Sequence, residues 1–146
     1  MSKAEEHGGQ LFAALRGGET IAPLIARDAS LTIDDAYRIS LDFLARRLAE
    51  GERIVGKKIG VTSKAVQDML GVGQPDFGFL TDWMQVEGDI DLAAKKLITP
   101  RAEAEIAFIL RDDLAGPGIT PDRVIDATEA ITPCFEIVDS RIDDWK

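Results

Sequence analysis

The chain has 146 residues, of which 45% are hydrophobic and 29% are charged, a composition typical of one ordinary globular domain. Its formal net charge of -9 excludes a basic stripe of the kind that binds nucleic acid through phosphates. No stretch reaches the roughly 18 consecutive apolar residues of a membrane helix, and the first residues do not form a signal peptide. The single Cys134 can form no internal disulfide, which is typical of a reducing compartment. We therefore predict a cytoplasmic protein that binds neither nucleic acid nor a membrane.

The first 52 residues are predicted to be mainly helical. One helix is expected from Glu5 to Arg16, and a second from 33 to 50, where Thr32 provides an N-cap. Residues 20–30 are predicted to be an irregular linker. His7 is the only histidine and lies near the terminus, so we predict a solvated side chain rather than a catalytic one.

The character of the chain changes at residues 53–63, which are predicted to form a strand that carries Lys57 and Lys58. Neighbouring residues of a strand point to opposite faces, so only one of these lysines can face a given pocket. A hydroxyl cap and a short helix over 64–70 are expected next, and then a loop that contains Asp76. From the residues alone, the lysines also fit an exposed edge strand, and Asp76 also fits a residue that orders its own turn.

Two carboxylates, separated by a single residue, lie in the apolar stretch 101–110, and a third lies in a similar stretch, 133–139. In a strand, Glu103 and Glu105 share one face, where they repel each other unless a cation or a shared proton is present. Together with Glu136 they offer only oxygen ligands, which suit Mg²⁺ or Mn²⁺ rather than Zn²⁺. The alternative is that the two glutamates simply line a solvated face.

A helix is predicted from Thr120 to about Ile131, because threonine is a good N-cap and Pro121 suits the first helical position. The glycines and proline of 116–118 predict a turn before it. We expect this helix to link the two carboxylate-bearing strands as a crossover.

Four segments in register resemble one known family. They are GKKIGVTS at 56–63, QPDFG at 74–78, PRAEAEIAF at 100–108 and FEIVDSRI at 135–142. The chain from about Leu31 to Lys146 thereby resembles the 2-keto-4-pentenoate hydratases, which are members of the fumarylacetoacetate hydrolase superfamily.

The resemblance implies a set of site residues that the residue patterns alone leave open. It implies metal ligands (Glu103, Glu105, Glu136 for Mg²⁺ or Mn²⁺), catalytic acid and base groups (Lys58, Asp76) and substrate contacts (Lys58, Leu70, Asp76).

For function, the resemblance implies a hydro-lyase of the meta-cleavage catabolism of aromatic compounds. Such an enzyme adds water to the small molecule 2-hydroxypenta-2,4-dienoate and gives 4-hydroxy-2-oxopentanoate. Cytoplasmic homo-oligomers are expected, with a complex with a pathway decarboxylase as a further option. Two alternatives stay open: an enzyme of the 4-oxalocrotonate decarboxylase type, and a catalytically inactive subunit.

For the fold, the resemblance implies an α+β protein. A helical region over residues 1–52 would be followed, over 53–146, by part of a metal-binding domain with the mixed sheet or β-roll of the fumarylacetoacetate hydrolase-like fold. Family members continue well beyond the length of this chain. We therefore expect an N-terminal part whose C-terminal half is missing.

Overall fold

The computed structural model describes residues 1–91 and 95–145, and it divides the chain into two compact units. The first unit consists of residues 1–97 and 141–146, and the second of residues 98–140. Helices and two antiparallel strand pairs make the protein α+β, as expected. A domain boundary after residue 52 stays a prediction. Within the described ranges, no helix has the length and apolar character needed to cross a membrane.

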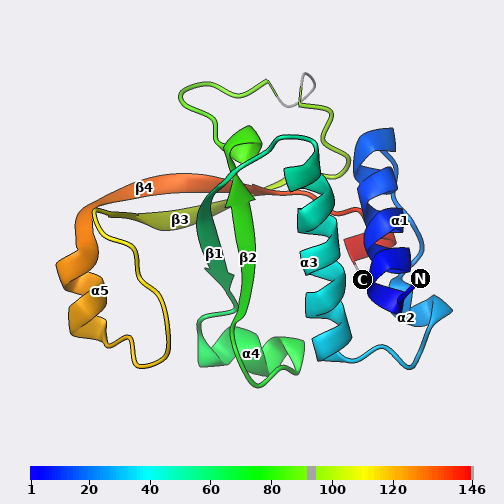
Figure 1. Cartoon of the computed structure of the whole chain (residues 1–146), viewed down its shortest axis with the longest axis horizontal. Coiled ribbons are helices and arrows are strands. Elements are labelled where there is room, and N and C mark those ends of the chain that lie inside the picture. Colours follow the sequence, from blue (N-terminus) through cyan, green and yellow to red (C-terminus); the bar gives the residue numbers. More distant parts are fainter. Residues whose placement is uncertain (92–94, 146) are drawn as a thin grey trace. The chain divides into compact units, whose positions relative to one another are not determined.

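Two capped helices, α1 (Lys3–Gly17) and α3 (Ile33–Ala49), lie side by side in the first unit (Figure 1). Each begins with a capping box, in which the hydroxyl of Ser2 or Thr32 accepts a hydrogen bond from a backbone N–H at 3.2 Å. Gly18 ends α1 in the left-handed conformation, with a φ of 70°. Both predicted helices are confirmed.

The contact between α1 and α3 forms most of the small core. The rings of Phe12 and Phe43 meet edge to face, with centroids 6.3 Å apart. The helices approach so closely at Gly8 that a Cβ there would stand 2.3 Å from the Oδ2 of Asp42. A glycine is therefore required at this point of α1.

The prediction of a solvated His7 is wrong. Its residue is only 5% exposed, and its Nδ1 lies 3.3 Å from the Oε1 of Gln10 one helical turn away. The reason is that α1 begins at Lys3, so His7 belongs to a regular helix and precedes the buried Gly8. No irregular terminus exposes it.

The segment predicted as an irregular linker contains the short helix α2 (Leu24–Arg27) and a pairing to the end of the chain. The N–H of Ile21 donates to the carbonyl oxygen of Arg141 at 2.9 Å, and the N–H of Asp143 donates back to Ile21 at 2.9 Å. The 3-10 helix η2 (Asp143–Trp145) follows. Residues 141–145 thus pack with the first unit.

A hairpin completes the first unit. Strand β1 (Ile54–Gly60) pairs antiparallel with β2 (Asp76–Thr81), and α4 (Lys64–Leu70) lies in their connection (Figure 1). Ser63 caps α4, as its hydroxyl position predicted. The 3-10 helix η1 (Asp82–Met84) follows β2.

The hairpin is joined to α3 through a buried polar cluster. Arg47 donates from Nε to the Oε2 of Glu52 at 2.8 Å and from Nη2 to the Oγ1 of Thr81 at 3.2 Å. The hydroxyl of Thr81 donates to the same Glu52 oxygen at 2.6 Å. Because every member is paired, burying these groups costs little, and the cluster fixes the base of the hairpin.

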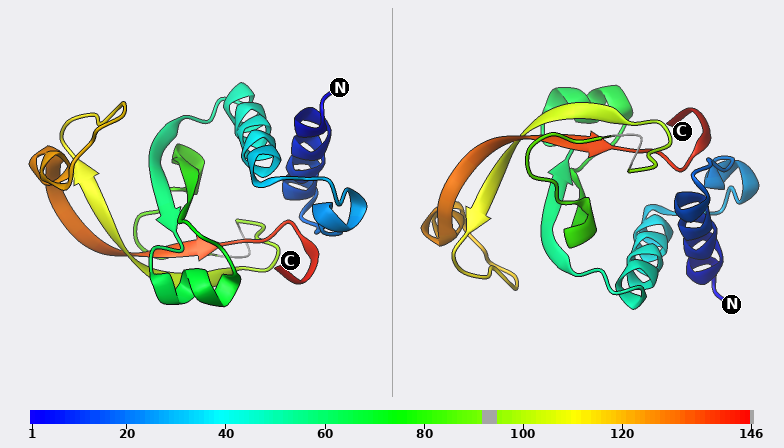
Figure 2. Two further views of the ribbon diagram at one scale, coloured as in Figure 1. Left: turned by 90° about the horizontal axis from the view of Figure 1, so that it is seen from below. Right: turned by 90° about the horizontal axis from the view of Figure 1, so that it is seen from above.

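The second unit is a long antiparallel ribbon of β3 (Arg101–Leu110) and β4 (Thr128–Val138), with α5 (Pro121–Ala127) in the connection (Figure 2). The pairing starts at Arg101 opposite Val138 and shifts register only between Ile109 and Leu110.

At the end of the ribbon where Arg101 pairs with Val138, one side chain binds the segment that precedes β3. The carboxylate of Asp139 accepts the backbone N–H groups of Ile98, at 3.0 and 3.1 Å, and of Thr99, at 2.7 Å. These bonds fix the chain just before β3.

Two details of the predicted connection are wrong. The helix ends at Ala127 rather than near Ile131, because Thr128 already has extended backbone angles. Ile131 belongs to β4, where it pairs with Phe108 of β3. The connection is not a crossover, since the strands that it joins are antiparallel neighbours. Its start at Thr120 and Pro121 is confirmed.

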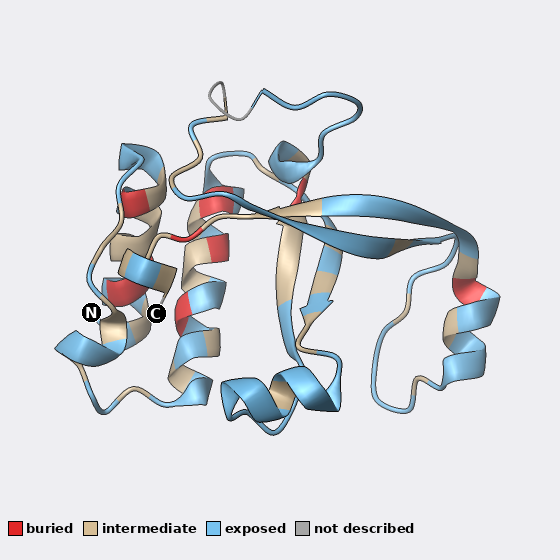
Figure 3. Ribbon diagram, turned by 180° about the vertical axis from the view of Figure 1, so that it is seen from behind, coloured by how far each residue is buried: buried red, intermediate tan, exposed pale blue. Residues whose placement is uncertain are grey.

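Strand alternation gives the ribbon two unlike faces. On one face, the paired positions in the middle of the ribbon carry only apolar residues. Most residues of both strands are exposed, as the colouring of Figure 3 shows. The exposed fraction is 64% for Ile106, 55% for Phe108, 61% for Ile131 and 77% for Phe135. The opposite face carries the glutamates of the predicted metal site.

Candidate active site

The three glutamates singled out in the sequence come together on one face of the ribbon. Glu103 and Glu105 are alternate residues of β3, and Glu136 of β4 lies directly opposite Glu103. One carboxylate oxygen from each lies within 4.8 Å of the other two. The strand pairing, rather than any loop, therefore positions all three carboxylates.

This arrangement fits a hard divalent cation. Two oxygens bound to one such cation at ~2.0 to 2.6 Å can be at most roughly 4 to 5 Å apart, so the three carboxylates can reach a common point. Glu103 and Glu105 are exposed and Glu136 is half-buried, which leaves room for water or a chelating ligand. Cys134, opposite Glu105, is on the same face and is exposed, a neighbour that the sequence reasoning did not connect with the site.

In the first unit, the adjacent lysines point to opposite faces of β1, as predicted. Lys57 is exposed, and its Nζ lies 5.9 Å from the ring centroid of its strand partner Phe79. Lys58 is half-buried and crosses its own partner, Gly78, so closely that a Cβ on Gly78 would stand 3.3 Å from the Lys58 Cγ.

Asp76 and Lys58 meet above Gly60, the last residue of β1. Asp76 is the strand partner of Gly60, and its Oδ1 lies 2.5 Å from the place where a Cβ on Gly60 would stand. The Nζ of Lys58 lies 3.2 Å from the same place. The structure thus brings together the two residues to which the resemblance gives acid and base roles.

Val61, the residue that follows Gly60, has a strained backbone conformation. Val61 has a φ of 56°, a left-handed conformation that a β-branched residue rarely adopts. The side-chain amide of Gln67 donates to the Val61 carbonyl oxygen at 3.0 Å, which ties the strained residue to α4.

Leu70 is the last residue of α4 and is 55% exposed. Its contact with a substrate stays a prediction, as do the ligand and acid-base roles of the other site residues. The carboxylate cluster lies in the second unit and the Lys58–Asp76 pair in the first.

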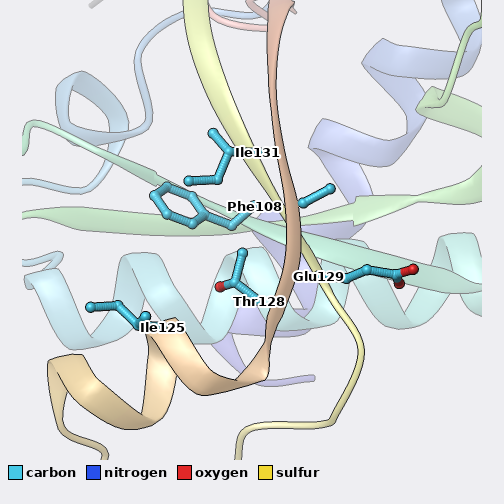
Figure 4. A pocket seen from close by; sticks show the side chains of 6 residues that line it. Phe108, Ile125, Thr128, Glu129 and Ile131 are labelled. Atoms are coloured by element: carbon cyan, nitrogen blue, oxygen red, sulfur yellow. The ribbon is translucent and has the colours of Figure 1, made fainter.

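A hollow of about 400 Å³ lies elsewhere in the second unit, near α5 (Figure 4). Phe108, Ile125 and Ile131 form its apolar part, and Thr128 and Glu129 line it as well. It holds none of the three clustered glutamates, and its apolar lining offers no set of groups for proton transfer or metal binding.

Comparison with known proteins supports the resemblance over nearly the whole chain. A 2-hydroxypent-2,4-dienoate hydratase of Pseudomonas putida is 59% identical over 142 residues, which cover 97% of this chain and 64% of that protein. A 2-hydroxyhexa-2,4-dienoate hydratase of Comamonas testosteroni is 59% identical over 144 residues, 97% of this chain and 54% of that protein. No family model matches the chain.

Solved structures of a related enzyme have the same fold. A 4-oxalocrotonate decarboxylase from Pseudomonas putida G7, complexed with magnesium and adipate, superposes with a TM-score of 0.89 at 33% identity, over 99% of this chain and 55% of that one. The same enzyme complexed with calcium and acetate gives a TM-score of 0.87.

The fold is therefore that of the fumarylacetoacetate hydrolase-like α+β enzymes. Over nearly all of its length the chain is similar to 2-keto-4-pentenoate hydratases and related dienoate hydratases, and it spans about half to two thirds of the length of the relatives that it matches.

Proposed function

We propose that this chain carries the metal site and the proton-transfer pair of a hydratase that converts 2-hydroxypenta-2,4-dienoate into 4-hydroxy-2-oxopentanoate. The observation that carries the proposal is the convergence of three carboxylates on one ribbon face, in a chain 59% identical to a dienoate hydratase. The names of further relatives, which are 2-keto-4-pentenoate hydratases, support the same reaction. We place it in the meta-cleavage catabolism of aromatic compounds, in the cytoplasm and as a homo-oligomer.

Glu103, Glu105 and Glu136 would hold Mg²⁺ or Mn²⁺ through carboxylate oxygens. The bound cation would stabilise negative charge that develops on the chelating oxygens of the substrate. Magnesium and calcium in the solved decarboxylase support a hard cation of this kind. The exposed position of two of the three glutamates leaves the cation accessible to a substrate carboxylate.

Lys58 and Asp76 would move the protons. A proton taken from the 2-hydroxyl group and delivered to the fifth carbon turns the dienoate into an unsaturated 2-oxo acid whose fourth carbon is electrophilic. Water then adds its oxygen to the fourth carbon, and a proton reaches the third carbon. A half-buried ammonium beside a carboxylate provides one donor and one acceptor for these transfers, with Leu70 as an apolar contact for the substrate.

A second candidate is a decarboxylase, favoured by the similarity to 4-oxalocrotonate decarboxylase. The higher identity to the hydratases, 59% against 33%, is the reason for preferring hydration. An association with a pathway decarboxylase, or a role as an inactive subunit, would make the same residues binding rather than catalytic groups.

The test is to incubate the purified chain with Mg²⁺ or Mn²⁺ and each of the two substrates in turn. We expect the dienoate to be consumed with formation of 4-hydroxy-2-oxopentanoate, and 4-oxalocrotonate to release no carbon dioxide. Carbon dioxide release without hydration would establish the decarboxylase. No turnover of either substrate, together with cation binding and co-elution with a full-length subunit, would establish the inactive subunit.

A further inference from the structure

Two glycines of the hairpin are placed where a side chain would collide with the proton-transfer pair. At Gly60, a Cβ would stand 2.5 Å from the Oδ1 of Asp76 and 3.2 Å from the Nζ of Lys58. At Gly78, it would stand 3.3 Å from the Cγ and 3.4 Å from the Cδ of Lys58. The two glycines therefore form the floor on which the Lys58 side chain and the Asp76 carboxylate lie.

The backbone does not explain these glycines. Six glycines of the described chain have a positive φ, and neither Gly60 nor Gly78 is among them. Glycine inside a strand weakens it, because it offers no side chain to pack and loses more freedom on folding. Space for neighbouring side chains is the remaining reason for glycine at both positions.

The other glycine of β1 provides a comparison within the same strand. Gly56 is on the same face as Lys58 and Gly60, because the three are alternate residues. A Cβ there would meet only the Leu80 side chain, at 3.7 Å, an ordinary van der Waals contact. Alanine is thus compatible with position 56 and incompatible with the observed arrangement at position 60.

We propose that Gly60 and Gly78 are positioning residues that hold the Lys58 ammonium and the Asp76 carboxylate beside one another, because glycine leaves these two side chains the space that a Cβ would fill. An ammonium and a carboxylate held side by side in this way can exchange protons with the same substrate or water oxygen. The assignment rests on the proposed function for its catalytic meaning, whereas the pairing of Lys58 with Asp76 can be measured without turnover.

The test measures the influence of Asp76 on Lys58 in the whole chain. In protein labelled with ¹³C-lysine, the Lys58 ¹³Cε resonance is assigned by its loss in Lys58→Arg, and its displacement by Asp76→Asn is recorded. We expect Gly60→Ala to reduce this displacement at least twofold and Gly56→Ala to leave it unchanged. Gly78→Ala, whose Cβ meets only the flexible lysine stem, should give an intermediate reduction and serves if Gly60→Ala fails to fold.

An unchanged displacement in folded Gly60→Ala or Gly78→Ala protein, or an equal reduction in Gly56→Ala, would overturn the assignment. Kinetics separate this outcome from failure of the proposed function. If the parent chain shows the displacement but hydrates no dienoate, the function is wrong and the positioning stands. If the chain is active, Gly60→Ala should lower kcat more than it changes KM, because it misplaces the reacting groups without removing a binding contact.

Discussion

Lys57 and Lys58 are chemically identical and adjacent in sequence. Because they point to opposite faces of β1, their surroundings differ. Lys57 is exposed and its ammonium lies near the ring of Phe79, whereas Lys58 is half-buried and its ammonium lies near Asp76. The sequence predicted that only one of them can serve a pocket. Only the resemblance to the hydratases indicated which one.

Lys58→Ala is expected to lower turnover of 2-hydroxypenta-2,4-dienoate by ~10² to 10⁴, because it removes a proton-transfer group. Mg²⁺ affinity should change little, since Lys58 provides no metal ligand. Lys57→Ala is the matched control and should change turnover only slightly. Steady-state kinetics and calorimetric Mg²⁺ titration of both variants check this, and equal losses in the two would contradict the assignment.

For the carboxylate cluster, Glu103→Gln and Glu136→Gln should each weaken Mg²⁺ or Mn²⁺ binding by about tenfold or more. The reason is that even changes to groups that only hydrogen-bond to the ligands of a metal cost ~10 to 100-fold in affinity, and these changes remove a charged ligand. Glu129→Gln, a change at an exposed β4 glutamate outside the cluster, is the control. Calorimetry with either cation measures the effect, and unaltered affinity in the cluster variants would place the metal elsewhere.

At the scale of elements, the hairpin that carries Lys58 and Asp76 depends on its buried attachment to α3. Thr81 is completely buried, and its hydroxyl group bridges Arg47 and Glu52, whose side chains are 2% and 8% exposed. Thr81→Val keeps the shape of the side chain but leaves both charged partners one hydrogen bond short.

Thr81→Val should therefore lower the free energy of unfolding by ~1 to 3 kcal/mol. Urea denaturation measures the loss, and Thr62→Val, at an exposed threonine of the same unit, should change the stability by less than about 0.5 kcal/mol. Equal effects of the two substitutions would show that the polar cluster does not stabilise the hairpin.

A contact between the two ends of the hairpin, Arg53 before β1 and Asp82 after β2, has a strength that depends on pH. The backbone N–H and then the guanidinium of Arg53 donate to Asp82 at 3.0 and 3.1 Å, and these bonds hold the pKa of Asp82 below its ordinary value of 3.8. The unfolded chain thus binds more protons than the folded chain just below that value. The stabilisation is full above about pH 4 and is lost as the pH falls through the lowered pKa.

Asp82→Asn should accordingly make the free energy of unfolding less dependent on pH below about pH 4. The contributions of other titrating groups to this pH dependence should stay as they are in the parent. Urea denaturation at a series of pH values measures this. Asp112→Asn, at an exposed aspartate in the loop after β3, is the control. A parent and an Asp82→Asn variant with parallel pH profiles would contradict the role of this carboxylate.

Local signals predicted the elements that begin with a cap. Thr32, Ser63 and Thr120 all start helices, because a hydroxyl and a free N–H are neighbours in sequence as well as in space. The end of α5 could not be predicted in this way. It is set by the pairing of β4 with β3, a contact between residues distant in the sequence.

For the whole molecule, the apolar face of the ribbon is the most conspicuous feature of the described surface. Phe135 and Ile106 are 77% and 64% exposed on it, and contiguous exposed apolar surface of this kind often marks an interaction site. Such a face promotes association.

The double variant Phe135→Ser with Ile106→Thr should bind less of a fluorescent apolar dye and sediment with a smaller average mass than the parent. The reason is that both replaced side chains lie on the exposed apolar face, where they offer surface to dye and to other copies. Glu103→Gln, on the opposite face, is the control and should leave both measurements unchanged. Dye binding that is equal in parent and double variant would locate the adhesive surface elsewhere.

The sequence predicted the common face of Glu103 and Glu105, because alternation is a local rule, whereas the α+β class was implied by the resemblance to the hydratases. It did not predict the buried His7 or the part played by Gly60 and Gly78. These glycines were not recognised as space for two side chains, because the strand partners of β1 were unknown.

Strand alternation also determines which changes in chain length the carboxylate cluster can survive. One residue inserted between Glu103 and Glu105 would turn one of the two glutamates to the apolar face and bring an apolar residue among the carboxylates. Two residues would restore the faces but move the glutamates apart along β3. In the connection between β3 and β4, by contrast, added residues do not change the face to which each strand residue points. Descendants of this sequence are therefore free to vary in length around α5, whereas the interval between the first two glutamates must stay at one residue.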